Sequence, residues 1–258
     1  MGLIGVLEKA NGNIINISNL DVYYKKTQVL KNITCHIPEN KITVIIGQSG
    51  CGKTTFLKTI NRIVEEEDGW FSGDIWVNSK RISDIPKEAL RKQVGLVFQT
   101  PIMFPFSIKK NMLYPLNYHY KQSESEKLEK INKYLRIVGL YDEIKGKLNI
   151  HATKLSGGQK QRLSIARCLC IEPDILMLDE PCSSLDIGNT LLIEKLLQEL
   201  KQQFTIVLVT HNLVQAKRIA DFVIFMDNGE LIEANDNSIF SNPREQRTRK
   251  YIEYMDCC

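Results

Sequence analysis

The sequence predicts an α/β protein, an open sheet of buried strands with helices between them. Two apolar runs, Ile42–Ile46 and Ile175–Leu178, are short and continuous, as is typical of strands buried on both faces. The first leads into the glycine-rich segment Gly47–Thr54 and the second into the adjacent acids Asp179 and Glu180. At 258 residues, the chain has the length of one large α/β domain, which we expect to cover residues 1–258.

Composition and charge are those of an ordinary globular protein. Hydrophobic residues make up 43% and charged residues 25%, and the formal net charge is +4. Basic residues are interspersed with acidic ones, so a nucleic-acid partner is not indicated. No apolar run reaches the roughly 18 residues needed to span a bilayer. Met1–Val6 lacks the basic start of a secretory signal and the Ser or Thr of a myristoylation motif, so we expect a cytosolic protein.

The segment Gly47–Thr54 matches the phosphate-binding pattern G-x-x-x-x-G-K-[ST] at every fixed position. It follows a predicted strand and opens a predicted helix, so backbone N–H groups and the positive end of the helix dipole face one anion. Lys53 is expected to reach the β- and γ-phosphates of a nucleotide and Thr54 to ligate Mg²⁺. The alternative is a glycine turn that merely joins strand to helix. The predicted phosphate-binding residues are Gly47, Gln48, Ser49, Gly50, Cys51, Gly52, Lys53, Thr54 and Thr55.

Upstream of this loop, residues 13–46 alternate apolar and polar side chains, which predicts half-buried antiparallel strands. The strands are expected at Ile14–Ile17, Leu20–Tyr24 and Leu30–Ile37, with a turn at Pro38–Asn40. Tyr24 offers a flat apolar ring on which a purine can stack. The alternative is an exposed strand tyrosine.

Between the phosphate loop and residue 100, the pattern alternates again. Apolar residues at helical spacing predict a helix over residues 56–64, and the acidic run Glu65–Gly69 is expected to be a solvated turn rather than a metal site. Strands are predicted at Gly73–Val77 and Val94–Gln99, with a short helix at Ile85–Arg91 between them.

From about residue 100 to 170 the chain reads as a helical insertion in the α/β core. Pro101–Phe106 is apolar and broken by prolines, so it cannot form a regular helix. Such an exposed loop is typical of a docking contact, and a loop packed on itself is the alternative. Ser123 and Glu126 are spaced as a capping box ahead of a helix.

After residue 170 the α/β alternation returns. A helix is predicted around Leu191–Leu197, followed by a strand at Phe204–His211. Phe222–Met226 and Glu230–Glu233 are expected to pair as a hairpin through Asp227–Gly229.

The paired acids at the end of the 175–178 strand suit magnesium-dependent chemistry. Asp179 lies where a P-loop NTPase holds Mg²⁺ through the water shell of the ion. Glu180 beside it is free to polarise an attacking water, because a general base must not be neutralised by the metal. The alternative is a solvated turn.

Seven cysteines are scattered without metal-binding spacing, and free thiols are expected in a reducing compartment. They are Cys35, Cys51, Cys168, Cys170, Cys182, Cys257 and Cys258. Cys51 differs because it lies beside Lys53 at a helix start, where the pKa of a thiol tends to fall. We expect alkylation of Cys51 to block nucleotide binding and ATP to protect it.

The pentapeptide Leu155–Gln159, followed by Gln161 and Arg162, decides between classes of P-loop protein. Together with the phosphate loop, Gln99, Asp179-Glu180, Ser184-Leu185-Asp186 and His211, in this order over nearly the whole chain, it resembles an ATP-binding cassette (ABC) ATPase. The resemblance implies a P-loop NTPase (RecA-like) core, an N-terminal antiparallel β subdomain and a helical subdomain inserted at about residues 100–170.

The resemblance also implies the cofactors ATP and Mg²⁺ and a head-to-tail dimer of two copies. Each ATP would lie between the phosphate loop of one copy and the signature segment of the other. By this resemblance the catalytic residues are Glu180, His211 and Gln99, the metal is held by Thr54, Gln99 and Asp179, Tyr24 stacks on adenine, and the residues contributed across the dimer are Ser156, Gly157, Gly158, Gln159 and Asp186.

Within the family, Val94–Pro101, Phe104–Ile108 and Glu180–Asp186 resemble the ATPases of bacterial phosphate importers. This implies that Thr100–Ile108 contacts a separate membrane permease at the cytoplasmic face of the membrane. A solute-binding protein would be an indirect partner. The chain departs from that group at Ile187, where proline is usual, and at Lys109-Lys110, where Tyr-Asp is typical.

Three alternatives stay open at this point. The same engine can serve another solute, such as an amino acid or another oxyanion, because nothing in this subunit touches the solute. A non-transport ABC ATPase of translation or DNA repair usually carries two cassettes or a long coiled coil, and neither is present. A regulator that binds nucleotide without hydrolysing it is disfavoured because Glu180 and His211 are both intact.

Overall fold

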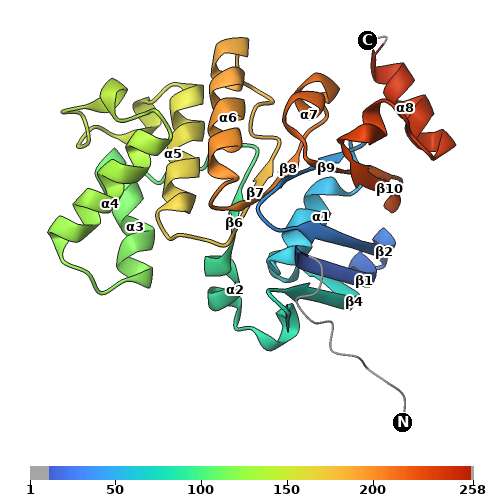
Figure 1. The fold of residues 1–258 in the computed structure, drawn as a ribbon. Helices are drawn as coiled ribbons and strands as arrows, with labels where there is room; N and C mark the ends of the chain where they lie inside the picture. The colour runs from blue at the N-terminus through green and yellow to red at the C-terminus, as the bar shows by residue number, and fades with distance from the viewer. Residues whose placement is uncertain (1–11, 257–258) are drawn as a thin grey trace.

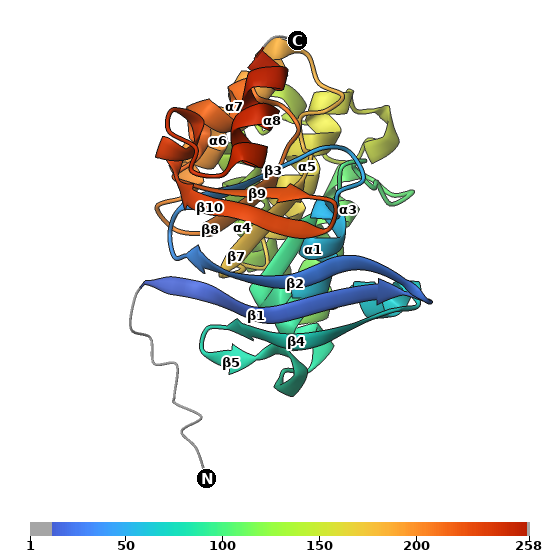
Figure 2. The same cartoon turned by 90° about the vertical axis from the view of Figure 1, so that its right-hand side faces the viewer.

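The N-terminal strands form an antiparallel sheet with the order β2-β1-β4-β5. In the computed structural model, which describes residues 12–256, these strands are β1 (Asn13–Tyr24), β2 (Thr27–Pro38), β4 (Gly69–Val77) and β5 (Lys80–Arg81). Figure 2 shows this layer beneath the second sheet. The predicted features at Met1–Val6 and at Cys257 and Cys258 lie outside the described residues.

The prediction of two strands at Ile14–Ile17 and Leu20–Tyr24 is wrong, because both segments belong to the single strand β1. The break in the pattern is a register shift between Ile17 and Leu20, next to Asn19 with its positive φ of 50°. Such a bulge adds a residue to one strand and bends it without ending it.

The second sheet has six strands in the order β10-β9-β3-β8-β7-β6. Its neighbours pair in parallel, except β10, which pairs antiparallel with β9. The bounds are β3 (Ile42–Ile46), β6 (Val94–Val97), β7 (Ile175–Asp179), β8 (Thr205–Val209), β9 (Phe222–Asp227) and β10 (Glu230–Asp236). Because β3, β7 and β8 are adjacent and parallel, their carboxyl ends meet at one edge of the sheet.

Helices cover this sheet on both faces. The α-helices of the described residues are α1 (Lys53–Ile60), α2 (Lys87–Gln93), α3 (Ile108–His119), α4 (Glu124–Ile137), α5 (Gly157–Leu169), α6 (Ile187–Leu200), α7 (Leu213–Ile219) and α8 (Gln246–Asp256). Short 3₁₀ turns are η1 (Val64–Glu67), η2 (Ile82–Asp84), η3 (Asp142–Ile144), η4 (Ala152–Lys154) and η5 (Asn237–Phe240). In Figure 1, α1 lies beside the antiparallel strands, while α5, α6 and α7 lie on the other side of the sheet.

Alternation along the buried strands divides the core into two parts. Val44 and Ile46 of β3 face a cluster that includes the apolar residues of α5 and α6. Ile45, between them, faces a second cluster that contains Phe56 and Leu57 of α1 and the inner face of the antiparallel sheet. The two-residue period of a strand therefore attaches both layers to the same central sheet.

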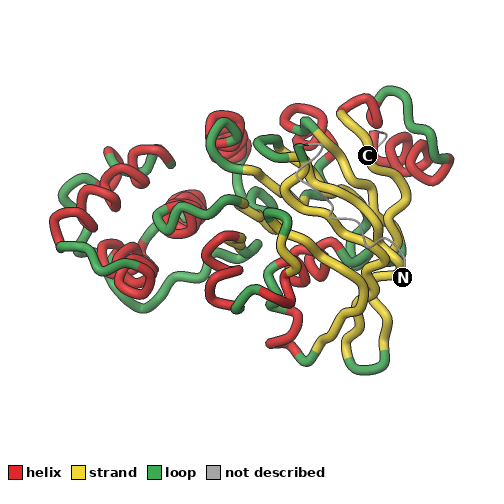
Figure 3. The backbone as a smooth tube through the Cα atoms, turned by 60° about the horizontal axis from the view of Figure 1, so that its bottom comes forward, coloured by secondary structure: helices red, strands yellow, loops and turns green. Residues whose placement is uncertain are grey.

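The segment between β6 and β7 contains α3, α4 and α5. The helices α3 and α4 stand apart from the strands (Figures 1 and 3), whereas α5 packs against β6. The predicted capping box at the start of α4 is confirmed. The Ser123 side chain accepts from the Glu126 N–H, and the Glu126 carboxylate accepts from the Ser123 N–H at 2.8 Å. This exchange satisfies two amides that a helix start leaves without partners.

The hairpin between β9 and β10 is also confirmed. Asn228 and Gly229 both have positive φ values, 50° and 81°, and Asp227 pairs with Glu230 across the turn. A two-residue loop of this geometry matches the twist of the flanking strands.

Other predicted boundaries were wrong. The helix predicted over 56–64 ends at Ile60, because Arg62 adopts a left-handed φ of 59° and η1 follows. The acidic run after it is largely exposed, as predicted, but it forms the turn η1, and Glu65 lies 2.7 Å from Arg62 and 3.1 Å from Lys87 in ion pairs. The helix predicted around Leu191–Leu197 is confirmed as part of α6, although Leu191 and Leu192 face solvent.

Within residues 12–256, no helix combines the length and apolar character that crossing a membrane requires.

Candidate functional site

The phosphate loop Gly47–Thr54 joins β3 to α1 at the carboxyl edge of the parallel strands. Gly47 has a φ of 153°, and a Cβ at this position would overlap the Met226 carbonyl of β9. Gly52 has a φ of 104°, and its Cβ would lie 2.5 Å from the Leu30 side chain. Both conformations are open to glycine alone, so these residues bring the backbone close enough to cradle an anion.

Lys53 begins α1 and is only 5% exposed. Its Nζ donates to the Gly47 and Gln48 carbonyl oxygens, each at 2.8 Å, which holds the ammonium inside the curl of the loop. No side chain caps the first amides of α1, so the N–H groups at its start stay available to an anion.

Thr54 on α1 meets Asp179 at the end of β7. The Thr54 hydroxyl lies 3.0 and 2.9 Å from the two carboxylate oxygens. Burial raises the pKa of Asp179, and the hydroxyl of Thr54 acts in the opposite direction. A hydroxyl and a carboxylate at this spacing are hard oxygen donors of the kind that Mg²⁺ prefers.

Glu180 follows β7 with a left-handed φ of 44°, which turns its side chain out of the strand. Its Oε2 lies 3.0 Å from His211 Nδ1 and accepts from Gln99 Nε2 at 3.3 Å. Its own N–H donates to the Val209 carbonyl of β8 at 3.0 Å. A non-glycine residue in this conformation is strained, and such strain is concentrated at functional sites.

Lys53, Thr54, Gln99 and Glu180 line one cavity of about 270 Å³ at the carboxyl edge of the sheet, whereas His211 lines a second cavity that shares Glu180. Asp179 lines neither and meets the first through Thr54. The first cavity is lined by Val29, Ser49, Gly50, Gly52, Lys53, Thr54, Thr55, Gln99 and Glu180. The fold thus brings the predicted phosphate-loop residues and the predicted general base to the same space.

The signature segment Ser156–Gln159 lies at the start of α5 and does not line that cavity. Ser156 caps the helix by accepting from the Gln159 N–H at 3.3 Å, and Gln159 accepts from the Ser156 N–H at 3.1 Å. Ser156 and Gly157 are exposed. A Cβ on Gly158 would lie 2.4 Å from the Asn189 side chain, so glycine permits α5 to approach α6 closely.

Asp186 is exposed and caps α6. It accepts from the Asn189 N–H at 2.9 Å and from the Asn189 side-chain amide at 2.6 Å. These hydrogen bonds lower the pKa of Asp186. Because Asn189 also lies against Gly158, Asp186 is near the start of α5 in the same chain. Asp186 does not line the phosphate cavity.

A protein-family comparison matches residues 30–183 to the ABC transporter model. This range covers more than half of the chain and includes the phosphate loop, the signature segment and the paired acids. The chain belongs to the ABC transporter family.

Curated relatives of this ABC protein include the phosphate import ATP-binding protein PstB of Bacillus cereus. It is 46% identical over 243 residues, which cover 93% of the chain and 90% of the relative. The PstB of Oceanobacillus iheyensis is 46% identical over 247 residues, with 94% and 90% covered.

Solved structures confirm the ABC ATPase fold. CbiO1 from Clostridium perfringens, described as part of the ABC transporter complex cbiONQ, superposes with a TM-score of 0.79 at 28% identity and covers 95% of this chain and 100% of its own. A bacterial Atm1-family ABC exporter with ATP bound gives a TM-score of 0.78 at 23% identity. There the match covers 93% of this chain and 41% of the exporter chain.

Tyr24 lies near the end of β1, outside the residues that line the phosphate cavity. Its hydroxyl donates to Glu67 at 3.1 Å, so it is not a free surface tyrosine. Burial raises the pKa of Tyr24 to about 12, and a hydrogen bond with the Thr55 side chain acts in the opposite direction. The ring therefore lies close to the first turn of α1.

The predicted low pKa of Cys51 is wrong. Cys51 is 5% exposed, and burial raises the pKa of its thiol more than Lys53 lowers it. The Lys53 Nζ lies 3.9 Å from the sulfur, but its other donors are directed at backbone oxygens. Desolvation thus outweighs the nearby positive charge.

Sequence reasoning missed three polar residues that orient the predicted ones. Ser183 accepts from Gln99 at 3.3 Å, Glu143 accepts from the Gln159 amide at 2.9 Å, and Asn189 holds Asp186. Ser183 and Asn189 flank the Ser184-Leu185-Asp186 motif, so proximity was an available signal for them. Glu143 lies 16 residues before its partner, and no pattern pointed to it.

Proposed function

We propose that this ABC protein is the ATP-hydrolysing subunit of an importer that drives uptake of inorganic phosphate through a separate membrane permease. The observation that carries the proposal is that Lys53, Thr54 and Glu180 line one cavity. Asp179 is hydrogen-bonded to Thr54 and His211 to Glu180, outside that lining. This arrangement occurs in a chain 46% identical to proteins named for phosphate import and ATP binding.

ATP binds first through its phosphates. The free amides at the start of α1 and the Lys53 ammonium face the β- and γ-phosphates. The Thr54 hydroxyl, the Asp179 carboxylate and the Gln99 amide oxygen would hold Mg²⁺, which would neutralise phosphate charge when bound. This all-oxygen donor set fits the ion.

Hydrolysis needs a base beside the γ-phosphate. Glu180 accepts a proton from the attacking water, and the hydrogen bond to His211 at 3.0 Å fixes the carboxylate in that position. Gln99 contacts the same carboxylate at 3.3 Å, so the glutamine that senses the bound phosphate also touches the base.

The second half of each site comes from another copy of the chain. The helix start at Ser156–Gln159, where Ser156 and Gly157 are exposed, offers N–H groups to the γ-phosphate of the partner's ATP. Asp186 lies beside this segment and reaches across the same interface. ATP thus holds two copies together, and its hydrolysis releases them.

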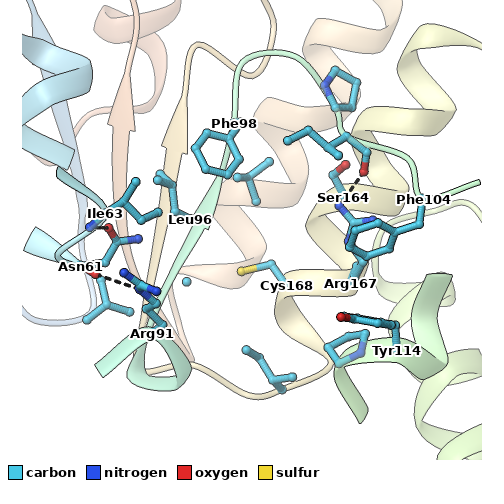
Figure 4. A pocket seen from close by; sticks show the side chains of 17 residues that line it. Asn61, Ile63, Arg91, Leu96, Phe98, Phe104, Tyr114, Ser164, Arg167 and Cys168 are labelled. Atoms are coloured by element: carbon cyan, nitrogen blue, oxygen red, sulfur yellow. Dashed lines mark hydrogen bonds between the residues drawn. The ribbon is translucent and has the colours of Figure 1, made fainter. Parts of the chain in front are cut away.

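The loop Thr100–Ile108 is the proposed contact for the permease. It borders an apolar groove of about 350 Å³ whose lining includes Phe98, Phe104 and Tyr114 (Figure 4). The guanidinium of Arg167 stacks on Phe104, 4.7 Å from the ring centroid. An apolar groove of this size suits the insertion of a short helix, which would place the subunit at the cytoplasmic face of the membrane.

Phosphate is favoured over an amino acid or another oxyanion by the names of the curated relatives. The cavity binds the nucleotide and has no contact with the solute, so the ATPase chemistry itself does not discriminate among them.

The test is reconstitution in liposomes with the permease subunits of a phosphate importer and their solute-binding protein. Phosphate-loaded binding protein is expected to stimulate ATP hydrolysis, and the same protein without phosphate is the control. Stimulation by an amino acid or sulfate instead would replace the solute. Failure to co-purify with any permease would remove the transport function.

A further inference from the structure

The acidic run Glu65–Glu67 connects the phosphate-loop helix α1 to strand β4. It forms η1 between α1 and β4, and each of its three carboxylates lies beside a cation. Glu65 pairs with Arg62 at 2.7 Å, and Glu66 pairs with Arg91 at 3.0 Å. These two contacts join the end of α1 to α2. Glu67 faces a different neighbour.

Glu67 contacts both the phosphate-loop helix and the predicted adenine platform. Its two oxygens accept from the Lys58 ammonium of α1 at 2.7 and 2.9 Å. Its Oε2 also accepts from the Tyr24 hydroxyl at 3.1 Å. One carboxylate thus ties the Tyr24 ring to the helix that begins with Lys53.

The backbone around Glu67 maintains this contact. Asp68 adopts a left-handed φ of 56°, and Gly69 pairs directly with Tyr24 in the β1–β4 ladder. A Cβ on Gly69 would lie 2.6 Å from the Val64 side chain, so only glycine lets β4 begin so close to η1. The register of β1 with β4 therefore places Glu67 beside the Tyr24 hydroxyl.

The hydroxyl is suited to donate throughout the physiological range. Burial and Glu67 both raise the pKa of Tyr24 to about 12, so the phenol stays protonated near neutral pH. A hydrogen bond to a carboxylate is stronger than one between neutral groups. It also holds the side chain in one rotamer, which reduces the entropy that a stacking base must otherwise remove.

We propose that Glu67 is a positioning residue that fixes the Tyr24 ring for the adenine base and ties it to the phosphate-loop helix through Lys58. The proposal rests on the proposed function, in which Tyr24 stacks on the base of bound ATP. It assigns a nucleotide-binding role to an acidic residue outside every recognised motif of the chain.

A positioning role has a specific signature. Tyr24→Phe keeps the ring and removes its bond to Glu67, whereas Glu67→Ala removes the acceptor and keeps the tyrosine. Because both changes break the same contact, their effects on nucleotide affinity should not add in the double variant. Inorganic tripolyphosphate carries no base, so its affinity should not change.

The experiment is calorimetric titration of the full-length protein with Mg²⁺ and either the β,γ-imido analogue of ATP or tripolyphosphate. Tyr24→Phe and Glu67→Ala should each raise the Kd of the nucleotide analogue about three- to tenfold, the range for one ordinary hydrogen bond, because Glu67 is exposed to solvent. The double variant should match the larger single effect. Glu67→Gln, which retains an acceptor, should recover most of the affinity. Glu66→Ala is the matched control and should stay within about twofold.

Several results would overturn the inference. Additive effects of Tyr24→Phe and Glu67→Ala would show independent roles. Weaker tripolyphosphate binding in Glu67→Ala would show that the residue only supports α1 through Lys58. An unchanged Kd in Tyr24→Ala would remove the stacking platform itself. Absence of analogue binding by the unmodified protein would instead remove the proposed ATPase function, so the two failures are distinguishable.

Discussion

The start of α1 and the start of α5 are two helix N-termini with opposite solutions for their amides. At α1, Gly52 precedes the helix and no side chain caps it. At α5, Ser156 and Gln159 form a capping box, and the Ser156 residue is exposed. The first helix start lines a cavity together with the buried Lys53, whereas the second does not line that cavity and lies on the surface.

The difference indicates that the two helix starts contribute unequally to nucleotide binding. The α1 half-site has free amides, a buried cation and oxygen donors for a metal, so it can bind a nucleotide by itself. The α5 half-site already satisfies part of its own hydrogen bonding and adds only a surface. We therefore expect changes at α1 to alter binding and changes at α5 to alter only steps that need a second copy.

The largest effect is expected at Glu180, the proposed general base of the α1 half-site. Glu180→Gln should lower kcat for ATP hydrolysis by about 10²- to 10⁴-fold, because the amide cannot accept a proton from water. Nucleotide affinity should be retained, and the dimer should accumulate with saturating ATP and Mg²⁺. Steady-state hydrolysis and size-exclusion chromatography measure the two quantities.

The control for this prediction is Glu199→Gln, an exposed acid on α6 with a side chain 64% accessible. It should retain normal turnover. Near-normal turnover in Glu180→Gln would assign the base elsewhere, and a protein that stays monomeric with ATP would contradict the shared site.

Removing the cation of the same half-site should act on binding. Lys53→Ala should raise the Kd of ATP about 10- to 100-fold, because charge-assisted hydrogen bonds to the phosphates are lost. Titration calorimetry measures the change, and Lys195→Ala on the exposed face of α6 is the control. An unchanged Kd would break the comparison, since α1 would then not be the binding half.

The part of the site that the residues predicted without the family resemblance is the part encoded by contiguous residues. In Gly47–Thr54, glycine conformation and helix polarity are local properties, so the pattern itself specifies the geometry. The same holds for the Ser123–Glu126 box, whose partners are three residues apart.

The missed part depends on tertiary contacts. The Tyr24–Glu67 bond joins residues 43 positions apart, and the Gln99–Ser183 bond spans 84. Neither distance follows from periodicity, because the register of β1 with β4 and the order of β6 and β7 set them. The pKa of Cys51 was misjudged for a related reason: charge proximity was visible in the sequence, but burial was not.

The α5 half-site gives a smaller effect that separates the two regions. Ser156→Ala should lower kcat about tenfold and leave the nucleotide Kd within about twofold, because in the proposed dimer the residue acts on the partner's ATP. It should also cost about 1 kcal/mol of stability through loss of the helix cap. ATP hydrolysis, calorimetry and thermal unfolding measure these quantities.

Ser123→Ala is the matched control, since it removes the same kind of capping box from α4. It should lower the free energy of unfolding by a similar amount and leave kcat unchanged. Equal losses of kcat in both variants would show that the effect of Ser156 is only structural.

The smallest effect concerns the thiol inside the α1 half-site. Because burial raises the pKa of Cys51, less thiolate is present at any given pH than for an ordinary cysteine. Iodoacetamide should therefore label Cys51 more slowly than a free thiol at pH 8, as measured by mass spectrometry. Cys51→Ser should leave the Kd of ATP within about twofold, because the backbone of the loop and not this side chain faces the phosphates. Fast labelling would mean that the loop opens readily without nucleotide. The contrast between the buried Cys51 of the α1 half-site and the exposed start of α5 would then not hold.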